Sequence, residues 1–277
     1  MARTGLGEEQ STDSYNATVD LLERNLAPGR AGRPYLNTKK RTWSYEEVAA
    51  GADAAGAGLL GMGIEPGDRV VVALRDSPEF VISFWGTMKA GIIPVPVTIG
   101  LSTPDVAFIL ADSEARAVIC DTTTADIVLG ALETSKRTCI VVGGRTGSGV
   151  ASWDDVCGRP ATLDPARTTG EDMALWLYTS GTTGIPKAVM HRHRHLKVQP
   201  DGLASQVLGM GPDDVVLSVS KMFFAYGLGN SVYLPAATGA SAVISAGPDA
   251  RSRSARASAA GSTGTDGCPD SDLFRSS

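Results

Sequence analysis

The chain has 277 residues, of which 43% are hydrophobic and 20% charged, as in a globular protein with one large or two modest domains. Its net charge of −5 and isoelectric point near 5.3 argue against nucleic-acid binding, because no basic surface would release counterions from a phosphate backbone. No apolar run reaches the ~20 residues that span a bilayer, and the polar N-terminus lacks the apolar segment of a secretory signal. We therefore expect a cytoplasmic protein without nucleic-acid or membrane partners.

The first clear element is a helix that opens at Ser44. Ser44 and Glu47 have the spacing of a capping box, in which each side chain satisfies an unpaired amide at the helix start. Apolar residues then fall on one helical face, and Gly61 and Gly63 are placed to end the helix in left-handed geometry. Residues 1–14, which precede the structured part, are predicted to be disordered.

Strands and helices alternate through the next eighty residues. The predicted elements are a buried strand at 67–76, a helix at 77–91, an edge or irregular strand at 92–98, a helix that opens at Thr103, and strands at 116–120 and 138–144. Prolines restrict the segment 92–98 to an edge, because proline cannot donate to a sheet ladder. This alternation predicts an α/β fold with a largely parallel sheet.

A second block begins near Met173 with the buried strand "MALWLY". Residues 189–210 have a mostly helical pattern, and further strands are predicted at 214–220 and 241–245. A glycine-rich stretch with several aromatic residues, 221–240, separates those two strands.

The segment "LYTSGTTGIPK", Leu177 to Lys187, has the composition of a phosphate-binding loop. Gly181 and Gly184 permit turns that point successive backbone N–H groups at one anion. The loop also offers hydroxyl groups that can donate to phosphate or bind Mg²⁺, from Thr179, Ser180, Thr182 and Thr183. Lys187 supplies a positive charge for a phosphate oxygen and is the candidate catalytic residue, acting by charge neutralisation.

The composition of this loop is also compatible with two other kinds of loop. The Walker A motif fails, because Pro186 stands five residues beyond Gly181, where that motif has glycine, and Ala188 follows the lysine. A P-loop ATPase is therefore disfavoured. The other alternative is a flexible Ser/Thr/Gly hairpin that binds no ligand. It is less favoured, because a buried strand precedes the loop and a lysine lies close by.

Histidines and cysteines give no strong indication of a metal site. His191 and His195 are four residues apart and could share a helical face, but no glutamate lies between them and no third acidic ligand is near. A basic face at the start of a helix is favoured, and His193 is not adopted as a nucleotide contact. Cys120 and Cys139 lie in apolar runs and are expected to be buried small hydrophobes. We predict no metal-binding residues.

The loop "YTSGTTGIPKAV" resembles the phosphate-binding motif of the adenylate-forming superfamily, which includes acyl- and aryl-CoA synthetases, luciferases and peptide-synthetase adenylation domains. The segments "WSYEEV", "GDRVVV", "MKAGIIPVPV" and "ILADSEARAVI" are similar, in the same order, to landmarks of the family's N-terminal domain. "YNATVDLLERNLAPGR" and "KMFFAYGLGNSVYLP" look most like benzoate–CoA ligases. The resemblance implies a partial AMP-binding N-terminal domain over residues 15–246, built of mostly parallel sheets flanked by helices.

The resemblance also implies a reaction and its participants. A carboxylate and ATP with Mg²⁺ give an acyl-adenylate and pyrophosphate, and the thiol of the co-substrate CoA then displaces AMP to form a thioester. The loop residues 179–184 and Lys187 would bind the phosphates. Ala225 and Tyr226 would flank an aromatic acid, and Gly227 would allow a close backbone approach. Without the resemblance, core packing is the favoured role of Tyr226; Phe223 and Phe224 are expected in the core in either case.

Several parts of the family's active site are not recognisable in this sequence. The glutamate that helps to hold Mg²⁺, the aspartate for the ribose, the hinge, and the C-terminal domain with its lysine cannot be found in residues 247–277. That segment is rich in Ser, Arg, Ala and Gly, so we expect it to be disordered and not native to the family, as after a reading-frame shift. The expected function is therefore an aryl-CoA ligase, truncated and impaired; the alternative is a non-catalytic fragment with weak nucleotide binding.

Overall fold

The computed structural model describes residues 13–132, 137–144, 146–179 and 186–244. The predictions for residues 1–12, for Ser180 to Gly184 of the phosphate loop and for residues 247–277 lie outside the described residues. Of the lead predicted to be disordered, Asp13 and Ser14 are described, and Ser14 pairs with Thr169 in an isolated bridge.

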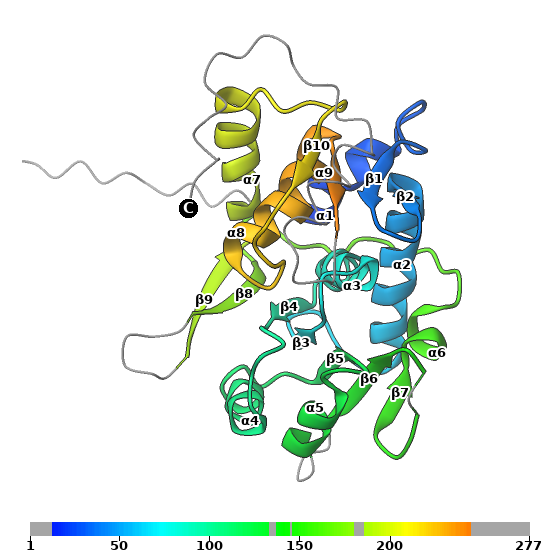
Figure 1. Ribbon diagram of the computed structural model, residues 1–277, viewed down its shortest axis with the longest axis vertical. Coiled ribbons are helices and arrows are strands. Elements are labelled where there is room, and N and C mark those ends of the chain that lie inside the picture. Colours follow the sequence, from blue (N-terminus) through cyan, green and yellow to red (C-terminus); the bar gives the residue numbers. More distant parts are fainter. Residues whose placement is uncertain (1–12, 133–136, 145, 180–185, 245–277) are drawn as a thin grey trace, which may run out of the picture.

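Helices and strands alternate along the described chain (Figure 1). The helical elements are α1 (Ala17–Leu21), η1 (Glu23–Leu26), α2 (Tyr45–Gly61), α3 (Pro78–Lys89), α4 (Thr103–Asp112), α5 (Ala125–Leu132), α6 (Trp153–Cys157), α7 (His195–Gln199), η2 (Pro200–Val207), α8 (Ala225–Leu228), η3 (Gly229–Tyr233) and α9 (Leu234–Thr238). The strands are β1 (Pro34–Asn37), β2 (Thr42–Ser44), β3 (Arg69–Ala73), β4 (Ile93–Pro96), β5 (Ala117–Asp121), β6 (Thr138–Val142), β7 (Val150–Ser152), β8 (Met173–Thr179), β9 (Lys187–Arg192), β10 (Val215–Leu217) and β11 (Ser241–Val243). None of the helices in this described part is long and apolar enough to cross a membrane.

The main sheet is parallel, which confirms the predicted α/β class. Its strand order is β4-β3-β5-β6-β7, with parallel pairing throughout, and the proline-containing β4 lies at its edge as predicted. A second sheet has the order β10-β11-β1-β2 and is parallel except for the β1–β2 pair. Strands β8 and β9 form a separate antiparallel hairpin.

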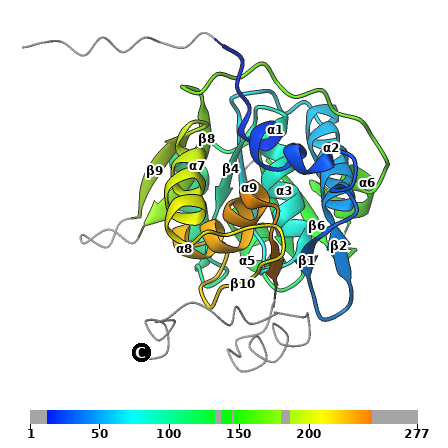
Figure 2. The ribbon, with the colours of Figure 1, turned by 90° about the horizontal axis from the view of Figure 1, so that it is seen from above.

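Side chains of the main sheet alternate between two apolar layers. Val70 and Val72 of β3 face the cluster that contains the buried sides of α2 and α3, whereas Val71 and Ala73 face the cluster beneath α4 and α5. The helices therefore cover both faces of the sheet (Figures 1 and 2). Cys120 and Cys139 belong to the second cluster and are fully buried free thiols, as predicted.

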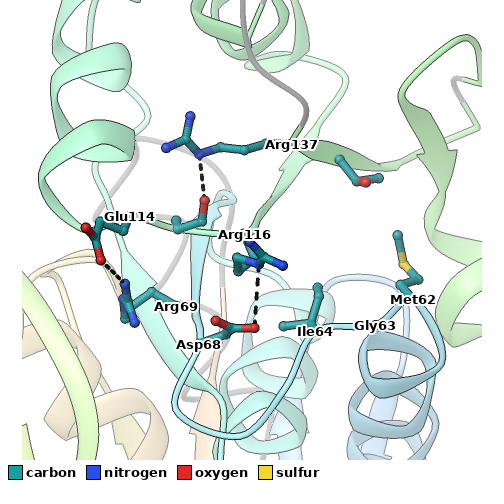
Figure 3. A pocket seen from close by; sticks show the side chains of 10 residues that line it. Met62, Gly63, Ile64, Asp68, Arg69, Glu114, Arg116 and Arg137 are labelled. Atoms are coloured by element: carbon teal, nitrogen blue, oxygen red, sulfur yellow. Dashed lines mark hydrogen bonds and ion pairs between the residues drawn. The ribbon is translucent and has the colours of Figure 1, made fainter.

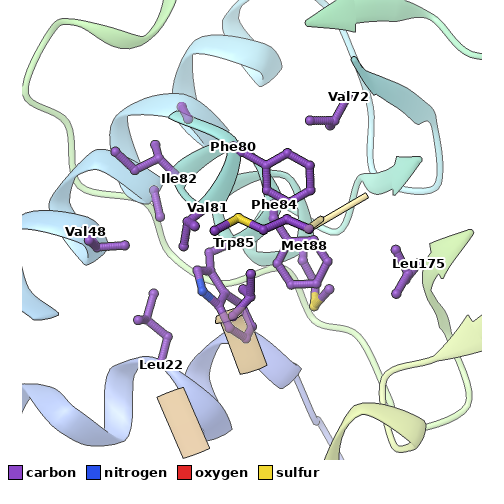
Figure 4. Packing of buried hydrophobic residues seen from close by; sticks show 14 of the residues in the cluster. Leu22, Val48, Val72, Phe80, Val81, Ile82, Phe84, Trp85, Met88 and Leu175 are labelled. Atoms are coloured by element: carbon purple, nitrogen blue, oxygen red, sulfur yellow. The ribbon is translucent and has the colours of Figure 1, made fainter. Parts of the chain in front are cut away.

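Helix α3 carries several of the largest fully buried side chains of the core (Figure 4). These are Phe80, Phe84, Trp85 and Met88, and each contributes roughly 1.5–3 kcal/mol by leaving water. The indole N–H of Trp85 donates to the hydroxyl of Tyr35 at 3.0 Å, and that hydroxyl donates to the Val232 carbonyl at 2.9 Å. The buried polar atoms of this chain of contacts are thus paired, as a stable core requires.

Helix α2 begins at the predicted capping box. The Ser44 N–H donates to a Glu47 carboxylate oxygen at 2.8 Å, and the Glu47 N–H donates to the Ser44 hydroxyl at 3.2 Å. Glycines then bring α2 and α3 into backbone contact, because a Cβ on Gly56 would lie 2.6 Å from the Gly86 carbonyl oxygen. Larger residues at these positions would force the two helices apart.

The helical prediction for residues 189–210 is wrong at its start. Residues up to Arg192 belong to strand β9, which pairs with β8 through the register Thr179↔Lys187, and helix α7 begins only at His195. Three of the six residues of β9 are exposed and the others are only half-buried, without alternation, so no period-2 burial pattern marks the strand. Backbone pairing with β8 defines it. Helical structure then continues, and it changes to a π-helix at Pro200, which lacks an N–H donor.

His193 connects the N-terminal helix α1 to the turn between β9 and α7. Its side chain is 1% exposed, and its Nδ1 accepts a hydrogen bond from the Ala17 backbone N–H at 3.1 Å. Burial lowers the pKa of His193 to about 4, and the nearby Asp172 only partly opposes this effect. The imidazole is therefore neutral at pH 7, which leaves Nδ1 free to accept.

We predict that His193 makes the folded state sensitive to acid. Because its folded pKa lies below the unfolded value of 6.5, its contribution is complete above pH 6.5 and is lost as the pH falls toward 4. Between pH 7.5 and pH 5 this loss amounts to about 2 kcal/mol of the free energy of unfolding. Urea unfolding at both pH values should show a smaller difference for His193→Asn, which retains an acceptor but does not titrate. Equal pH dependence in both proteins would contradict the assignment.

Candidate functional site

Strands β8 and β9 bring Thr179 and Lys187 together at the mouth of the predicted phosphate loop. The two residues are register partners, and the Thr179 hydroxyl donates to the Lys187 carbonyl at 3.4 Å. Both residues are exposed, so the Lys187 ammonium group is accessible to an anion. The structure thus pairs the first and last predicted phosphate contacts; the contacts between them, Ser180 to Gly184, lie outside the described residues.

The end of β8 is fixed to helix α4 by a hydrogen bond. The Tyr178 hydroxyl donates to an Asp112 carboxylate oxygen at 2.5 Å. Burial and the adjacent Asp112 carboxylate both raise the pKa of Tyr178, which keeps its hydroxyl protonated as the donor. Trp176 of the same strand has its ring centre 5.7 Å from the guanidinium of Arg69, which belongs to β3. Side-chain contacts with α4 and β3 therefore hold strand β8 in place where the loop begins.

The aromatic segment that precedes α8 divides into buried and exposed residues. Phe223 is buried as predicted, but the prediction that Phe224 lies in the core is wrong, since 53% of Phe224 is exposed. Phe224 is the extended N-cap residue of α8, and successive side chains of an extended backbone point to opposite sides. Tyr226 is 63% exposed, which rules out the alternative of core packing for that ring.

Ala225 lines a pocket of about 310 Å³ between the β8–β9 hairpin and helices α7, α8 and η3. The other lining residues are Leu175, Leu177, His191, His195, Leu196, Val198, Gln199 and Tyr233. At one side the Tyr233 hydroxyl donates to the Gln199 side-chain oxygen at 2.7 Å. The pocket thus has apolar walls from β8 and a few polar groups, the usual arrangement of a small-molecule site.

The sequence identified only Ala225 among these lining residues. Leu175 and Leu177 are two apart on a strand, so their common face follows from the period of a strand once β8 is recognised. Gln199 and Tyr233 had no comparable signal, because their contact spans 34 residues and joins two short helical elements.

Gly227 makes a close approach to the protein's own backbone. A Cβ at this position would lie 2.0 Å from the Lys221 carbonyl oxygen and 2.6 Å from that of Ser220. The residue therefore sets the tight turn that places Ala225 and Tyr226, whatever ligand they contact.

A concavity of about 920 Å³ lies at the amino ends of β3, β5 and β6 (Figure 3). Two of its arginines hold the end of α4: Arg69 donates to the Ser113 carbonyl at 2.6 Å and pairs with Glu114 at 3.0 Å, and Arg137 donates to the Ala115 carbonyl at 2.7 Å. These contacts are structural, so we assign no chemistry to this concavity despite its size.

The histidines do not share a helical face, so that suggestion is wrong. His191 lies on β9 and His195 is the first residue of α7, with their ring centres 6.1 Å apart and nearly perpendicular. Across the part of the chain that the structure describes, no three His, Cys, Asp or Glu side chains gather as metal ligands do. His193 is buried against Ala17, so its role is structural.

We predict that Gly227→Ala destabilises the protein by about 1–3 kcal/mol, because the clash is with backbone atoms that cannot rotate away. Gly202→Ala is the matched control, since a Cβ there has nothing within 4 Å and lies in the helical element η2. Denaturant unfolding should show Gly202→Ala to be neutral or slightly stabilising. Equal stability of the two variants would contradict the tight turn.

Comparison with known proteins identifies the family of the chain. The model of the AMP-binding enzyme family matches residues 23–260. The 4-hydroxybenzoate–CoA/benzoate–CoA ligase of Rhodopseudomonas palustris is 36% identical over 232 residues, which are 83% of this chain and 43% of that protein. The benzoate–CoA ligase of Thauera aromatica is 35% identical over 84% of this chain and 45% of its own length.

Solved structures of CoA ligases are also similar to this chain. A benzoate CoA ligase from Burkholderia xenovorans superposes with a TM-score of 0.79 and 30% identity, over 87% of this chain and 48% of that one. The anthranilate CoA ligase AuaEII, solved in complex with anthranoyl-AMP, has a TM-score of 0.79 and 33% identity, over 84% and 45%. The chain spans less than half the length of these relatives. Its family match over residues 23–260 shows that the chain belongs to the AMP-binding enzymes, the adenylate-forming superfamily, alongside aryl-CoA ligases.

Proposed function

We propose that this chain provides the phosphate loop and part of the acid pocket of an ATP-dependent aryl-CoA ligase of the benzoate–CoA ligase type. In the reaction a carboxylate attacks the α-phosphate of ATP, pyrophosphate leaves, and the CoA thiol then displaces AMP to give a thioester. The observation that carries this proposal is the pairing of Thr179 with Lys187 in a hairpin whose other residues line a pocket together with Ala225, in a chain of this family. A cytoplasmic location is part of the same proposal.

The phosphate loop would act by neutralising charge. A carboxylate that approaches a triphosphate brings two anions together, so positioned donors lower the barrier. The exposed Lys187 and the Thr179 hydroxyl are described donors that could serve the departing pyrophosphate, with residues 180–184 as further proposed contacts. Mg²⁺ would accompany ATP and neutralise its phosphates, bound by phosphate oxygens, water and loop hydroxyls, the oxygen ligands it prefers.

The pocket suits the aromatic ring of a carboxylic acid better than a strongly polar or additionally charged group. Leu175, Leu177 and Ala225 supply apolar surface for a ring, and the volume of about 310 Å³ lies at the small end of ligand pockets. Tyr226, exposed beside Ala225, could contact the ring edge-on. Relatives named for benzoate, hydroxybenzoate and anthranilate support the same class of substrate.

A second candidate is a nucleotide-binding chain without turnover. Its support is the number of large apolar residues that are exposed between β9 and α8, namely Val189, Met190, Val198, Leu203, Val207, Leu208 and Phe224. Large exposed apolar side chains are often covered by a partner when they lie together. Their number in one part of the chain favours a site that is complete only when further polypeptide covers it.

One experiment separates the two candidates. The full chain is incubated with ATP, Mg²⁺, benzoate and CoA, and pyrophosphate, thioester and ATP binding are each measured. The ligase proposal expects pyrophosphate release that depends on benzoate. The second candidate expects ATP binding without pyrophosphate, and ATP hydrolysis that ignores benzoate would contradict both.

We predict that Lys187→Ala weakens ATP binding about 10- to 100-fold, the usual effect of losing a charge-assisted contact. Stability should not change, because the Lys187 side chain is exposed. Lys40→Ala, an exposed lysine between β1 and β2, is the control and should bind ATP as the wild type does. Equal ATP affinities of the two variants, measured by calorimetry, would refute the role of Lys187.

A further inference from the structure

Asp76 lies where the main sheet meets the aromatic segment. It follows strand β3 at the carboxyl edge of the parallel sheet, and it is only 4% exposed. A carboxylate in so buried a place is stable only with hydrogen-bonded partners. Its partners come from a segment 146 residues further along the chain.

The two oxygens of Asp76 contact two successive residues of that segment. Oδ1 accepts a hydrogen bond from the Met222 backbone N–H at 3.0 Å, and Oδ2 lies 3.4 Å from the Lys221 ammonium group. The Asp76 side chain is 3% exposed and that of Lys221 is 27% exposed, so water screens this ion pair weakly. Asp76 therefore fixes both the charge and the backbone of the segment.

This anchor is connected to the acid pocket through a short, rigid path. The Lys221 carbonyl accepts from the Phe224 N–H at 3.0 Å, and the Phe224 carbonyl accepts from the Leu228 N–H at 2.8 Å. Gly227 packs directly on the same Lys221 carbonyl. Any shift of Lys221 is consequently passed to α8, whose first residue is Ala225.

Apolar contacts keep the segment on the protein independently of Asp76. Met222 is 1% exposed and Phe223 is 7% exposed, both within the main core cluster. Loss of the Asp76 contacts should therefore loosen the position of the segment while the fold persists.

We propose that Asp76 is a positioning residue that holds Ala225 and Tyr226 at the acid pocket through its contacts with Lys221 and Met222. Asp76 does not line the pocket that contains Ala225, so it acts through the segment and not on the acid. The identity of the bound acid rests on the proposed function, but the contacts of Asp76 with Lys221 and Met222 can be tested without any substrate.

The first test is amide hydrogen exchange on the full chain. Asp76→Ala should exchange at least about 10-fold faster in residues 222–228, because the Met222 amide loses its acceptor. Asp76→Asn keeps an acceptor oxygen and should recover much of the protection. Asp213→Ala, which removes a side chain that is 91% exposed, is the control and should leave this segment unchanged. Unchanged exchange in Asp76→Ala would overturn the proposal.

The second test compares two affinities of the same proteins. Asp76→Ala should weaken benzoate binding about 10-fold and leave ATP binding unchanged, with partial rescue in Asp76→Asn. A merely structural role would weaken both ligands alike, and that result would overturn the positioning role. If the wild type binds no benzoate while exchange responds as expected, the proposed function fails and the anchor stands.

Discussion

Parallel pairing of the main sheet is the constraint on which the site depends. Because β4, β3, β5, β6 and β7 all run the same way, their carboxyl ends meet at one edge, where α/β proteins commonly bind ligands. Asp76 stands at that edge, and the aromatic segment docks on it from far along the chain. The opposite edge holds the concavity of about 920 Å³, where Arg69 and Arg137 hold the end of helix α4. Strand direction thus separates the edge at which the proposed site is anchored from a structural edge.

Much of this fold could be predicted from local patterns. Patterns of a few residues predict three of its features. A β-branched run predicts β3, the capping box at Ser44 predicts the start of α2, and the prolines of β4 predict its place at an edge. Strand β9 could not be recognised in this way, because its exposed side chains leave no burial period and only pairing with β8 defines it. Helix α5 likewise has no distinct pattern of its own, since it is short and lies between two strongly apolar strands.

The residues of the candidate site likewise differ in whether a local sequence pattern identifies them. Thr179, Lys187 and Ala225 lie in short segments whose composition or family resemblance singles them out, and their binding roles stay predictions. Contacts that join distant parts of the chain, such as Gln199 with Tyr233 and Asp76 with Met222, have no local signal. Those contacts decide the shape and position of the pocket, so sequence gives the chemistry of this site more readily than its geometry.

The glycine-rich face of α2 has a consequence for the order of folding. Helix α2 contains four glycines, and each costs about 1 kcal/mol of intrinsic helix stability relative to alanine. Two of them allow backbone contact with neighbouring helices: Gly56 packs on the Gly86 carbonyl of α3, and Gly58 packs on the Val156 carbonyl of α6. An isolated α2 would therefore be mostly unfolded, and its helix should form together with α3 in one cooperative step, not as an early local nucleus.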